Sequence, residues 1–550
     1  MNISALQKER AKYQPKLPKS LAGAVKLVEG AKTGSVADQD EIAKLFPNTY
    51  GMPLITFEEG EVKKDRQAIN VGVILSGGQA PGGHNVISGI FDGIKKINPD
   101  SRLYGFLGGP GGLVDHKYVE LTAEFIDEYR NTGGFDIIGS GRTKLEEEWQ
   151  FDKGLEIAND LNLNALVVIG GDDSNTNACV LAEYYAAKNA GVQVIGCPKT
   201  IDGDLKNEMI ETSFGFDTAT KVYSELIGNI QRDANSAKKY WHFIKLMGRS
   251  ASHIGLECAL KTQPNITLIS EEVAEKKQTL EEIVEYMAGI VAKRAENGDN
   301  FGVALIPEGL IEFIPEMKVL ISELNDLLAE GSDSEKEFKM LRKSHRNEWI
   351  ASHLSDDSAK VFKSLPPGIA TQLTLDRDPH GNVQVSLIET EKLLGEMVKN
   401  RLEKMKKAGG YVGKFGTQYH FFGYEGRCAA PSNFDADYCY SLGYTASLLI
   451  SDGKTGYMSS VRNLTAPAEE WIAGGVPVTM MMNMEKRHGH MKPVIQKALV
   501  ELEGAPYKFF VSKRGEWAFT TQFVYPGPIQ YFGPPEVCDL ATETLKFEKE

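Results

Sequence analysis

The amino-acid sequence predicts an α/β protein of two Rossmann-like, three-layer domains with an active-site cleft between them. Short apolar runs, such as residues 71–75 and 165–169, alternate along the chain with longer helical patterns. This alternation is typical of buried parallel strands joined by helices. The chain has 550 residues, which is too many for one ordinary hydrophobic core and favours at least two domains.

The order of these patterns divides the chain into four parts. Residues 1–67 and 471–550 are expected to be extensions packed on the body. The first α/β domain comprises residues 68–220 and about 428–470; the second comprises residues 221–427, with a charge-rich helical insertion at about 312–363. Strands are predicted at residues 71–75, 103–107, 135–139, 165–169 and 192–195 in the first domain and at 240–246, 266–269 and 301–306 in the second.

The composition narrows the possible functions. Hydrophobic residues make up 42% of the chain and charged residues 25%, as in a globular protein. The net charge of −14 argues against a general nucleic-acid surface. No apolar run is long enough to span a bilayer, and the N-terminal residues lack the apolar core of a signal peptide. The six cysteines lack metal-ligand spacing. We expect a cytoplasmic protein with buried free thiols and no nucleic-acid or membrane partner.

A glycine-rich turn, Ser-Gly-Gly-Gln-Ala-Pro-Gly-Gly at 76–83, follows the first predicted strand and precedes a helix. Backbone N–H groups and a helix N-terminus in such a turn can cradle a phosphate. The turn is neither a Walker A loop nor a dinucleotide fingerprint. Taken alone, it is also compatible with a tight turn that needs glycine only for its geometry.

Basic and acidic residues follow further strand ends of the first domain. Arg142 and Lys144 come after the run at 135–139 and are candidate phosphate ligands, with ordinary surface charge as the alternative. Gly-Gly-Asp-Asp-Ser at 170–174 places Asp172 at a strand tip as a magnesium candidate, with a turn or helix cap as the alternative.

The segment Lys-Thr-Ile-Asp-Gly-Asp at 199–204 carries the densest chemistry. A hydroxyl acceptor needs a carboxylate to take its proton, and we assign that role to Asp202. Asp204 is placed to help hold metal or phosphate, Thr200 to donate to a substrate oxygen, and Lys199 to neutralise a phosphate. The alternative is an Asx-turn loop with incidental charge.

The second domain supplies Arg249 and Glu308, at the ends of two predicted strands. A cation for a sugar phosphate and a carboxylate for sugar hydroxyls would suit this edge, although a surface ion pair is the alternative reading.

Seven motifs in one order make the chain resemble the phosphofructokinase family. They are Gly-Gly-Gln-Ala-Pro-Gly at 77–82, Gly-Ser-Gly-Arg at 139–142, Gly-Gly-Asp-Asp-Ser at 170–174, Thr-Ile-Asp-Gly-Asp at 200–204, Met-Gly-Arg at 247–249, Pro-Glu-Gly at 307–309 and Tyr-Glu-Gly-Arg at 424–427. The resemblance covers most of residues 70–310 and returns at 424–450. It implies Mg²⁺-dependent phosphoryl transfer to the 1-hydroxyl of fructose 6-phosphate, a glycolytic step.

The resemblance also implies roles for individual residues. Asp202 is the base, with Lys199, Asp204 and Arg249 as further catalytic groups, and Asp172 is the magnesium ligand. The sugar-phosphate site comprises Thr200, Asp202, Met247, Gly248, Arg249, Glu308, Tyr424 and Arg427, and the donor site comprises Gly78, Arg142, Lys144, Asp173 and Lys199. Tyr240 falls where the family reaches into a neighbouring subunit's sugar site, often with an arginine. The resemblance thus implies a homodimer or a higher homo-oligomer.

Two residues indicate the phosphoryl donor. ATP-using members that resemble this chain carry glycines where Asp173 and Lys199 stand. Asp173 adds volume and negative charge beside a nucleotide's α-phosphate, and Lys199 offers a cation to a pyrophosphate end. The pair resembles the pyrophosphate-dependent, long-form branch, which implies a readily reversible reaction. The alternatives are an ATP-dependent phosphofructokinase with a shifted loop, a catalytically silent regulatory subunit, and a lipid or dinucleotide kinase that shares Gly-Gly-Asp.

Overall fold

The structure is a computed structural model that describes residues 5–61, 66–329, 331–374, 383–487, 490–529, 535 and 539–550. The chain forms two compact units, built from segments that are interleaved along the sequence. Unit 1 comprises Met1–Val222, Tyr424–Ala498 and Ile529–Glu550, and unit 2 comprises Tyr223–Gly423 and Leu499–Pro528. Each unit therefore closes only when distant parts of the chain come together.

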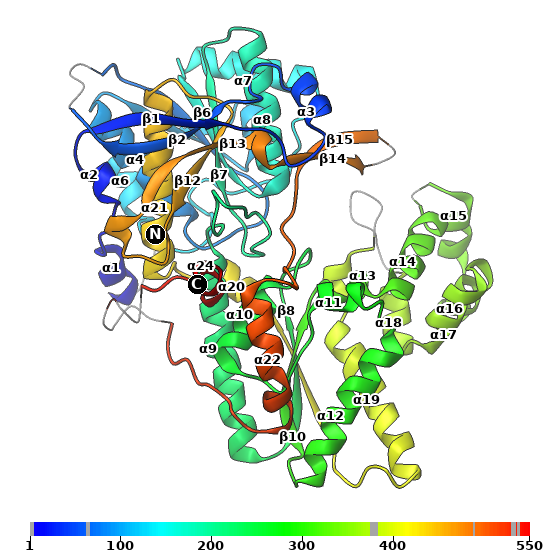
Figure 1. Ribbon diagram of the computed structural model, residues 1–550. Coiled ribbons are helices and arrows are strands. Elements are labelled where there is room, and N and C mark those ends of the chain that lie inside the picture. Colours follow the sequence, from blue (N-terminus) through cyan, green and yellow to red (C-terminus); the bar gives the residue numbers. More distant parts are fainter. Residues whose placement is uncertain are drawn as a thin grey trace. The chain divides into compact units, whose positions relative to one another are not determined.

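Unit 1 is organised around one nine-stranded sheet (Figure 1), with the strand order β1-β2-β13-β12-β7-β6-β3-β4-β5. The strands are β1 (Val25–Lys32), β2 (Pro53–Glu59), β3 (Asn70–Leu75), β4 (Arg102–Phe106), β5 (Tyr118–Glu120), β6 (Ala165–Gly170), β7 (Gln193–Pro198), β12 (Tyr457–Arg462) and β13 (Ile472–Pro477). The central strands β12, β7, β6, β3 and β4 are parallel, and the pairs that flank them are antiparallel. Every residue of β6 is buried, as expected for a parallel strand that is covered on both faces.

Helices cover both faces of this sheet. Side chains alternate across each strand, so Ile74, Leu166 and Val168 share a core with Phe151 and Leu181 beneath the helices of one face. These helices are α5 (Pro110–Val114), α7 (Glu148–Asp160) and α8 (Asp172–Ala187). The further helices of unit 1 are α1 (Ala5–Ala11), α2 (Lys19–Ala22), α3 (Gln39–Leu45), α4 (Gly83–Ile97), α6 (Ala123–Asp127), α20 (Tyr424–Arg427), α21 (Asn433–Ser451) and α24 (Glu543–Lys549).

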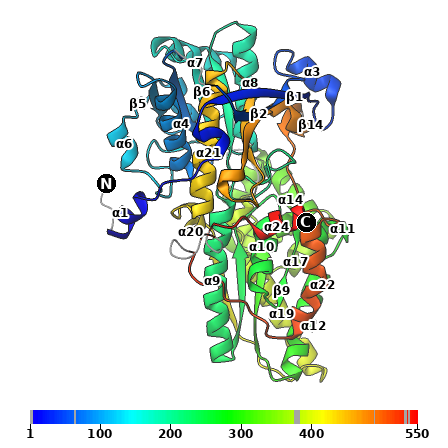
Figure 2. The same cartoon turned by 60° about the vertical axis from the view of Figure 1, so that its left-hand side comes forward.

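Helices α4 and α21 run side by side in both views (Figures 1 and 2), although more than 300 residues separate them in the sequence. Glycines allow this close approach. A Cβ on Gly89 would lie 2.2 Å from the backbone oxygen of Tyr440, and one on Gly443 would lie 2.0 Å from that of Val86. The helix that follows the glycine-rich turn is thereby fixed by a segment from the far end of the chain.

The stretches expected to be terminal extensions are parts of the units. Strands β1 and β2, from residues 1–67, widen the sheet of unit 1, and β13 lies between β12 and β2. The hairpin of β14 (Met482–Arg487) and β15 (His490–Ile495) follows β13. Helix α22 (Ala505–Phe519) belongs to unit 2, where Arg514 makes a two-pronged ion pair with Glu272 at N–O distances of 2.6 and 2.8 Å.

One predicted strand is wrong. Residues 135–139 form a turn, with the N–H of Gly139 bonded to the oxygen of Phe135 at 2.8 Å. The outer edge of β4 pairs instead with the antiparallel strand β5. Phe135, Ile137 and Ile138 are buried, so their apolar character serves packing rather than a strand.

Unit 2 contains a four-stranded parallel sheet with the order β11-β8-β10-β9. Its strands are β8 (Tyr240–Leu246), β9 (Ile266–Thr267), β10 (Phe301–Pro307) and β11 (Thr417–Phe422). The chain enters this unit within α9 (Phe216–Ala237). Helices α10 (His253–Thr262), α11 (Ser270–Glu275), α12 (Leu280–Glu296), α13 (Leu310–Phe313) and α19 (Thr390–Lys407) accompany the strands.

A group of helices occupies the region where a helical insertion is predicted. These are α14 (Pro315–Leu327), α15 (Asp333–Met340), α16 (Lys343–His353), α17 (Asp356–Ser364) and α18 (Pro367–Gln372). Phe338, Ile350 and Phe362 belong to the same hydrophobic core as Trp241 and Ile306 of the sheet. The helices are therefore packed into unit 2.

Two further predictions can be compared with the fold. Among the residues that the structure describes, no helix combines the length and the apolar character needed to cross a membrane. Four cysteines, Cys179, Cys197, Cys258 and Cys439, are buried free thiols, as predicted. Cys428 is also a free thiol but is exposed, and Cys538 lies outside the described residues.

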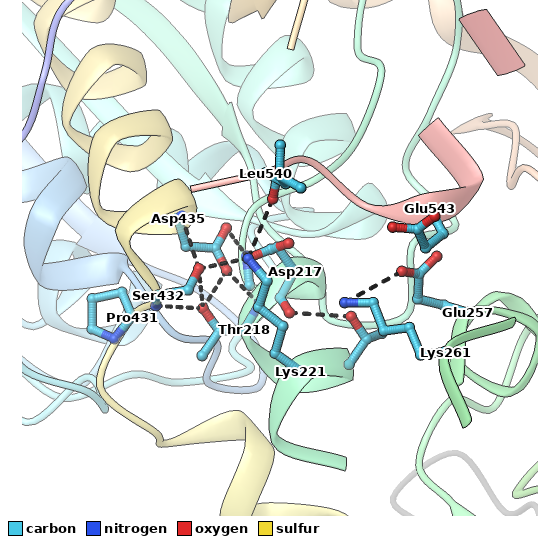
Figure 3. Close-up of polar contacts among 12 residues, drawn as sticks. Asp217, Thr218, Lys221, Glu257, Lys261, Pro431, Ser432, Asp435, Leu540 and Glu543 are labelled. Carbon is cyan, nitrogen blue, oxygen red and sulfur yellow. Dashed lines mark hydrogen bonds and ion pairs between the residues drawn. The ribbon is translucent and has the colours of Figure 1, made fainter. Parts of the chain in front are cut away.

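A buried polar network joins the start of α9 to the start of α21 within unit 1 (Figure 3). The Asp435 carboxylate accepts from the backbone N–H of Gly215 at 3.1 Å and from the Thr218 hydroxyl at 2.5 Å. Ser432 and Lys221 both donate to Asp217, at 2.6 and 2.7 Å. Burial and the charge of Asp217 raise the pKa of Asp435 to about 7. The network ties together the two places where the chain leaves unit 1, near the start of α9, and re-enters it, shortly before α21.

Thr218→Val should destabilise unit 1 by about 1–3 kcal/mol, because it leaves buried partners without their hydrogen bonds. The lost hydroxyl donates to Asp435 and accepts from the backbone N–H of Ser432. Urea denaturation followed by tryptophan fluorescence would measure the change. The control is Thr371→Val, at an exposed helical position. Equal midpoints for both variants would contradict a stabilising role for the network.

Candidate active site

Three neighbouring strands of unit 1 bring the predicted donor residues to one edge of the sheet. Strand β6 pairs in parallel with both β3 and β7. The glycine-rich turn follows β3, Asp172 begins α8 directly after β6, and Lys199 follows β7. Because parallel strands end at the same edge of a sheet, the glycine-rich turn, Asp172 and Asp173, and the 199–204 loop lie together.

Hydrogen bonds hold these loops in register. The Ser174 hydroxyl bonds to that of Ser76 at 2.8 Å, and the backbone N–H of Lys199 donates to Gly170 at 2.9 Å. The buried Asn175 amide donates to the oxygens of Gly170 and Cys197, at 2.6 and 3.2 Å. The first turn of α8 is thereby tied to both neighbouring strand ends.

Two cations face the glycine-rich turn. A Cβ on Gly77, where φ is +84°, would lie 3.5 Å from the Lys199 ammonium. A Cβ on Gly78 would lie 2.0 Å from a guanidinium nitrogen of Arg427, whose Nε also donates to the oxygen of Gln79 at 3.3 Å. The missing side chains thus leave a surface where an anion can meet backbone and two cations together.

Burial decides the protonation of Lys199. Its side chain is only 6% exposed. Burial and the nearby Arg427 lower the pKa of Lys199 to about 8, although Asp202, Asp172 and Asp204 act in the opposite direction. The ammonium is therefore charged at neutral pH and loses its proton as the pH rises past about 8.

Carboxylates gather beside these cations. Burial and the charge of Asp202 raise the pKa of Asp204 to about 7, with Asp172 adding to the rise and Lys497 opposing it. The Lys497 ammonium lies 3.6 Å from Asp172 and 3.8 Å from Asp204. Burial would lower the pKa of Lys497, but the carboxylates outweigh burial and raise it.

The loop that carries Asp202 is held by its own side chains. The backbone N–H of Asp202 donates to the Thr200 hydroxyl at 3.1 Å, and the Ser213 hydroxyl donates to the backbone oxygen of Thr200 at 2.9 Å. Asp202 is half-buried at this turn, whereas Asp204 is buried. The more accessible carboxylate is the better placed of the two to meet a substrate.

The other predicted donor residues of unit 1 lie around this centre. Gly141 accepts from the N–H of Gly77 at 2.8 Å, so the loop that carries the exposed Arg142 is fixed to the turn. Lys144 is half-buried further along this loop. Asp173 is exposed in the first turn of α8.

Tyr424 and Arg427, both predicted for the sugar site, lie in unit 1, and the Tyr424 side chain is exposed. The Arg427 guanidinium carbon lies 5.4 Å from the centre of the Tyr424 ring. Both residues therefore accompany the glycine-rich turn.

The remaining predicted sugar residues form a second group at strand ends of unit 2. The Glu308 carboxylate accepts from the backbone N–H of Gly248 at 3.0 Å. Gly248 has φ of +126°, which favours glycine. Arg249 makes a two-pronged ion pair with Glu312, at 3.1 and 3.2 Å. Met247 is buried, and its N–H bonds to Phe422. Glu308 thus shapes the Met-Gly-Arg turn, and Glu312 orients the arginine.

Tyr240 does not join this group. It is the first residue of β8, whereas Met247 follows the last. At about 3.3 Å per residue, the strand separates the two by roughly 23 Å. Tyr240 has a left-handed backbone with φ of 71°. Its predicted role is in a neighbouring subunit's site.

The carboxylates fit a magnesium ion that takes only part of its coordination shell from the protein. Within the described part of the chain, no group of three or more His, Cys, Asp or Glu side chains could by itself hold a metal. Mg²⁺ often takes only one or two carboxylates, with water and substrate phosphate oxygens completing its shell. Asp172 and Asp204 converge on one ammonium, so they already share a position for a cation.

Sequence reasoning missed Lys497 and Glu312. Lys497 lies in the C-terminal stretch from which no chemistry was expected, and it reaches Asp172 because it follows β15, which packs against α8. Glu312 lies four residues after Glu308, on α13. Its pairing with Arg249 depends on the pairing of β8 with β10, so no local pattern marks either Glu312 or Lys497.

A glycine-rich anion turn, clustered cations and carboxylates at the ends of parallel strands define the class of phosphoryl-transfer proteins. The family model described as phosphofructokinase matches residues 70–450. The chain therefore belongs to the phosphofructokinase family.

Full-length relatives make the similarity more specific. The chain is 63% identical over 549 residues to the pyrophosphate–fructose 6-phosphate 1-phosphotransferase of Porphyromonas gingivalis, with 100% of both chains covered. It is 57% identical over 562 residues to the protein of that name from Treponema pallidum (strain Nichols), with 100% of this chain and 98% of the relative covered.

A solved structure supports the fold. The crystal structure of a pyrophosphate-dependent phosphofructokinase from Nitrosospira multiformis matches with a TM-score of 0.54 at 16% identity. The match covers 86% of this chain and 97% of the other. At this identity the likeness concerns the α/β fold alone, which the sequence predicts.

Gly78→Ala should weaken the binding of inorganic pyrophosphate about 10- to 100-fold while leaving the fold intact. The new Cβ would collide with the end of the Arg427 side chain, which is flexible enough to move away. The displaced guanidinium would then lose its charge-assisted contacts to the anion. Isothermal titration calorimetry with circular dichroism would measure both effects. Gly289→Ala, where a Cβ meets nothing within 4 Å, is the matched control. Unchanged affinity would remove Arg427 from the anion site.

Proposed function

We propose that this protein transfers a phosphoryl group reversibly from pyrophosphate to the 1-hydroxyl of fructose 6-phosphate, giving fructose 1,6-bisphosphate and phosphate. The observation that carries the proposal is the buried Lys199 ammonium, directed at Gly77 of the anion turn. The names of the full-length relatives support the same activity.

The choice of donor follows from volume and charge. A lysine side chain fills space that a larger donor would need, and it supplies a compact positive charge to a small polyanion. Asp173 adds a negative charge in the first turn of α8, beside the same strand end. That charge would repel the inner phosphate of a nucleotide, whereas pyrophosphate has no such extension. Both features favour pyrophosphate over ATP.

The residues of unit 1 then divide the work of phosphoryl transfer. Lys199, Arg427 and the backbone N–H groups of the glycine-rich turn neutralise and align the donor, with Arg142 on the loop fixed to that turn. Asp202 accepts the proton of the sugar hydroxyl as the new O–P bond forms. Most of the rate gain comes from positioning and charge stabilisation, because little covalent chemistry falls to the protein.

The residues of unit 2 hold the sugar phosphate in this proposal. Arg249 offers a planar cation to the 6-phosphate, with Glu312 orienting it, and Glu308 fixes the Met-Gly-Arg turn. Tyr240 acts in the site of a neighbouring subunit, so the enzyme is a homodimer or a higher homo-oligomer.

The site also fits Mg²⁺, held by Asp172 with Asp204 beside it. When bound, the ion would help to neutralise the negative charge of the donor. The Asp204 carboxylate is a second group near the position that the Lys497 ammonium occupies.

A donor assay tests the function. Purified protein receives fructose 6-phosphate and Mg²⁺ with either pyrophosphate or ATP, and fructose 1,6-bisphosphate is measured. We expect product with pyrophosphate alone. Product with ATP alone would keep the family and overturn the argument from Asp173 and Lys199. Product with neither donor would favour a silent regulatory subunit.

Asp202→Asn should lower the turnover rate roughly 100- to 10,000-fold while substrate binding is retained, because an amide cannot take the hydroxyl proton. Steady-state kinetics and calorimetric titration with fructose 6-phosphate would separate the rate from the binding. Glu208→Gln, at an exposed position a few residues further along, is the control. Near-normal turnover of Asp202→Asn would show that another group is the base.

A further inference from the structure

Lys497 is placed in the donor site by its own backbone. The N–H of Gln496 donates to Met481 at 2.8 Å, and that of Ala498 donates to the backbone oxygen of Asp204 at 2.7 Å. Both neighbours of Lys497 are thus fixed, and the second is bonded to the loop that carries Asp202 and Asp204. Such anchoring directs the long side chain toward the carboxylates.

The ammonium of Lys497 lies between two of these carboxylates. Its distances of 3.6 Å to Asp172 and 3.8 Å to Asp204 exceed those of ordinary hydrogen bonds. The contact is therefore mainly electrostatic, with one cation shared by two anions. Asp202 and Asp173 contribute to the same negative field. The second lysine of the site, Lys199, faces the glycine-rich turn instead.

A divalent cation held by Asp172 would need space that the Lys497 ammonium now occupies. It would also supply the positive charge that the ammonium now supplies. Mg²⁺ binds carboxylate oxygens at about 2.0–2.1 Å, well inside the present ammonium distances. Two cations only a few ångströms apart repel each other strongly in a partly buried site. A metal ion shared by Asp172 and Asp204 would therefore compete with the ammonium for its present position.

We propose that Lys497 is a positioning residue that takes the place of the metal ion. Its ammonium holds Asp172 and Asp204 together before the metal binds, and it withdraws when the metal binds. The side chain is 36% exposed, so the flexible stem can swing toward solvent while the anchored backbone stays in place. The inference rests on the proposed function only in taking Mg²⁺ as the ion.

The proposal predicts that Lys497 weakens metal binding in the wild-type protein. Lys497→Met keeps an unbranched stem but removes the competing charge. We expect this variant to bind Mn²⁺, a spectroscopic substitute for Mg²⁺, at least about fivefold more tightly at pH 8, as relief of charge repulsion requires. Electron paramagnetic resonance of unbound Mn²⁺ measures the affinity, with no pyrophosphate or sugar present.

Lys492→Met is the matched control, because Lys492 lies on β15 and makes an exposed ion pair with Glu146. Its Mn²⁺ affinity should equal that of the wild-type protein. Equal or weaker Mn²⁺ binding by Lys497→Met would overturn the proposal, and so would an absence of Mn²⁺ binding by all three proteins. Since no donor is present, these outcomes are independent of the result of the donor assay.

Discussion

The constraint on which the donor site depends is the mutual repulsion of four aspartates. Asp172, Asp173, Asp202 and Asp204 occupy two loops at the ends of neighbouring parallel strands. Like charges so close together are stable only when protons or cations compensate them. The structure uses both means: Asp204 has a raised pKa, and the ammonium groups of Lys199 and Lys497 lie beside the group. A site built in this way is prepared for a highly charged substrate.

The compensating cations come from distant parts of the chain. Lys199 belongs to the strand end itself, whereas Arg427 and Lys497 arrive after the whole of residues 223–423 has been traversed. The α4–α21 contact and the network of Asp217 and Asp435 fix the return of the chain to unit 1. Packing far from the chemistry thereby determines whether the charges of the donor site balance.

The central strands and most of the site were predictable because each depends on local sequence. Strands β3, β6 and β10 are largely apolar runs, and the glycine and aspartate loops that follow them keep recognisable spacing. The apolar run at 135–139 was wrongly predicted to be a strand, because a buried turn also needs apolar side chains. Lys497 was out of reach, since its role depends on where β15 brings it. The same holds for β13, which joins the sheet only through tertiary pairing.

The position of β13 between β12 and β2 has a consequence for biosynthesis. Residues 55–56 of β2 pair with residues 474–475, about 420 residues later in the chain. At a translation rate of about 5–20 residues per second, the β1–β2 hairpin leaves the ribosome roughly 20–80 s before its partner exists. During that time one edge of the hairpin is an open template for wrong pairing. The fold of unit 1 is therefore completed only after residues 474–475 have been synthesised and cover this edge of β2.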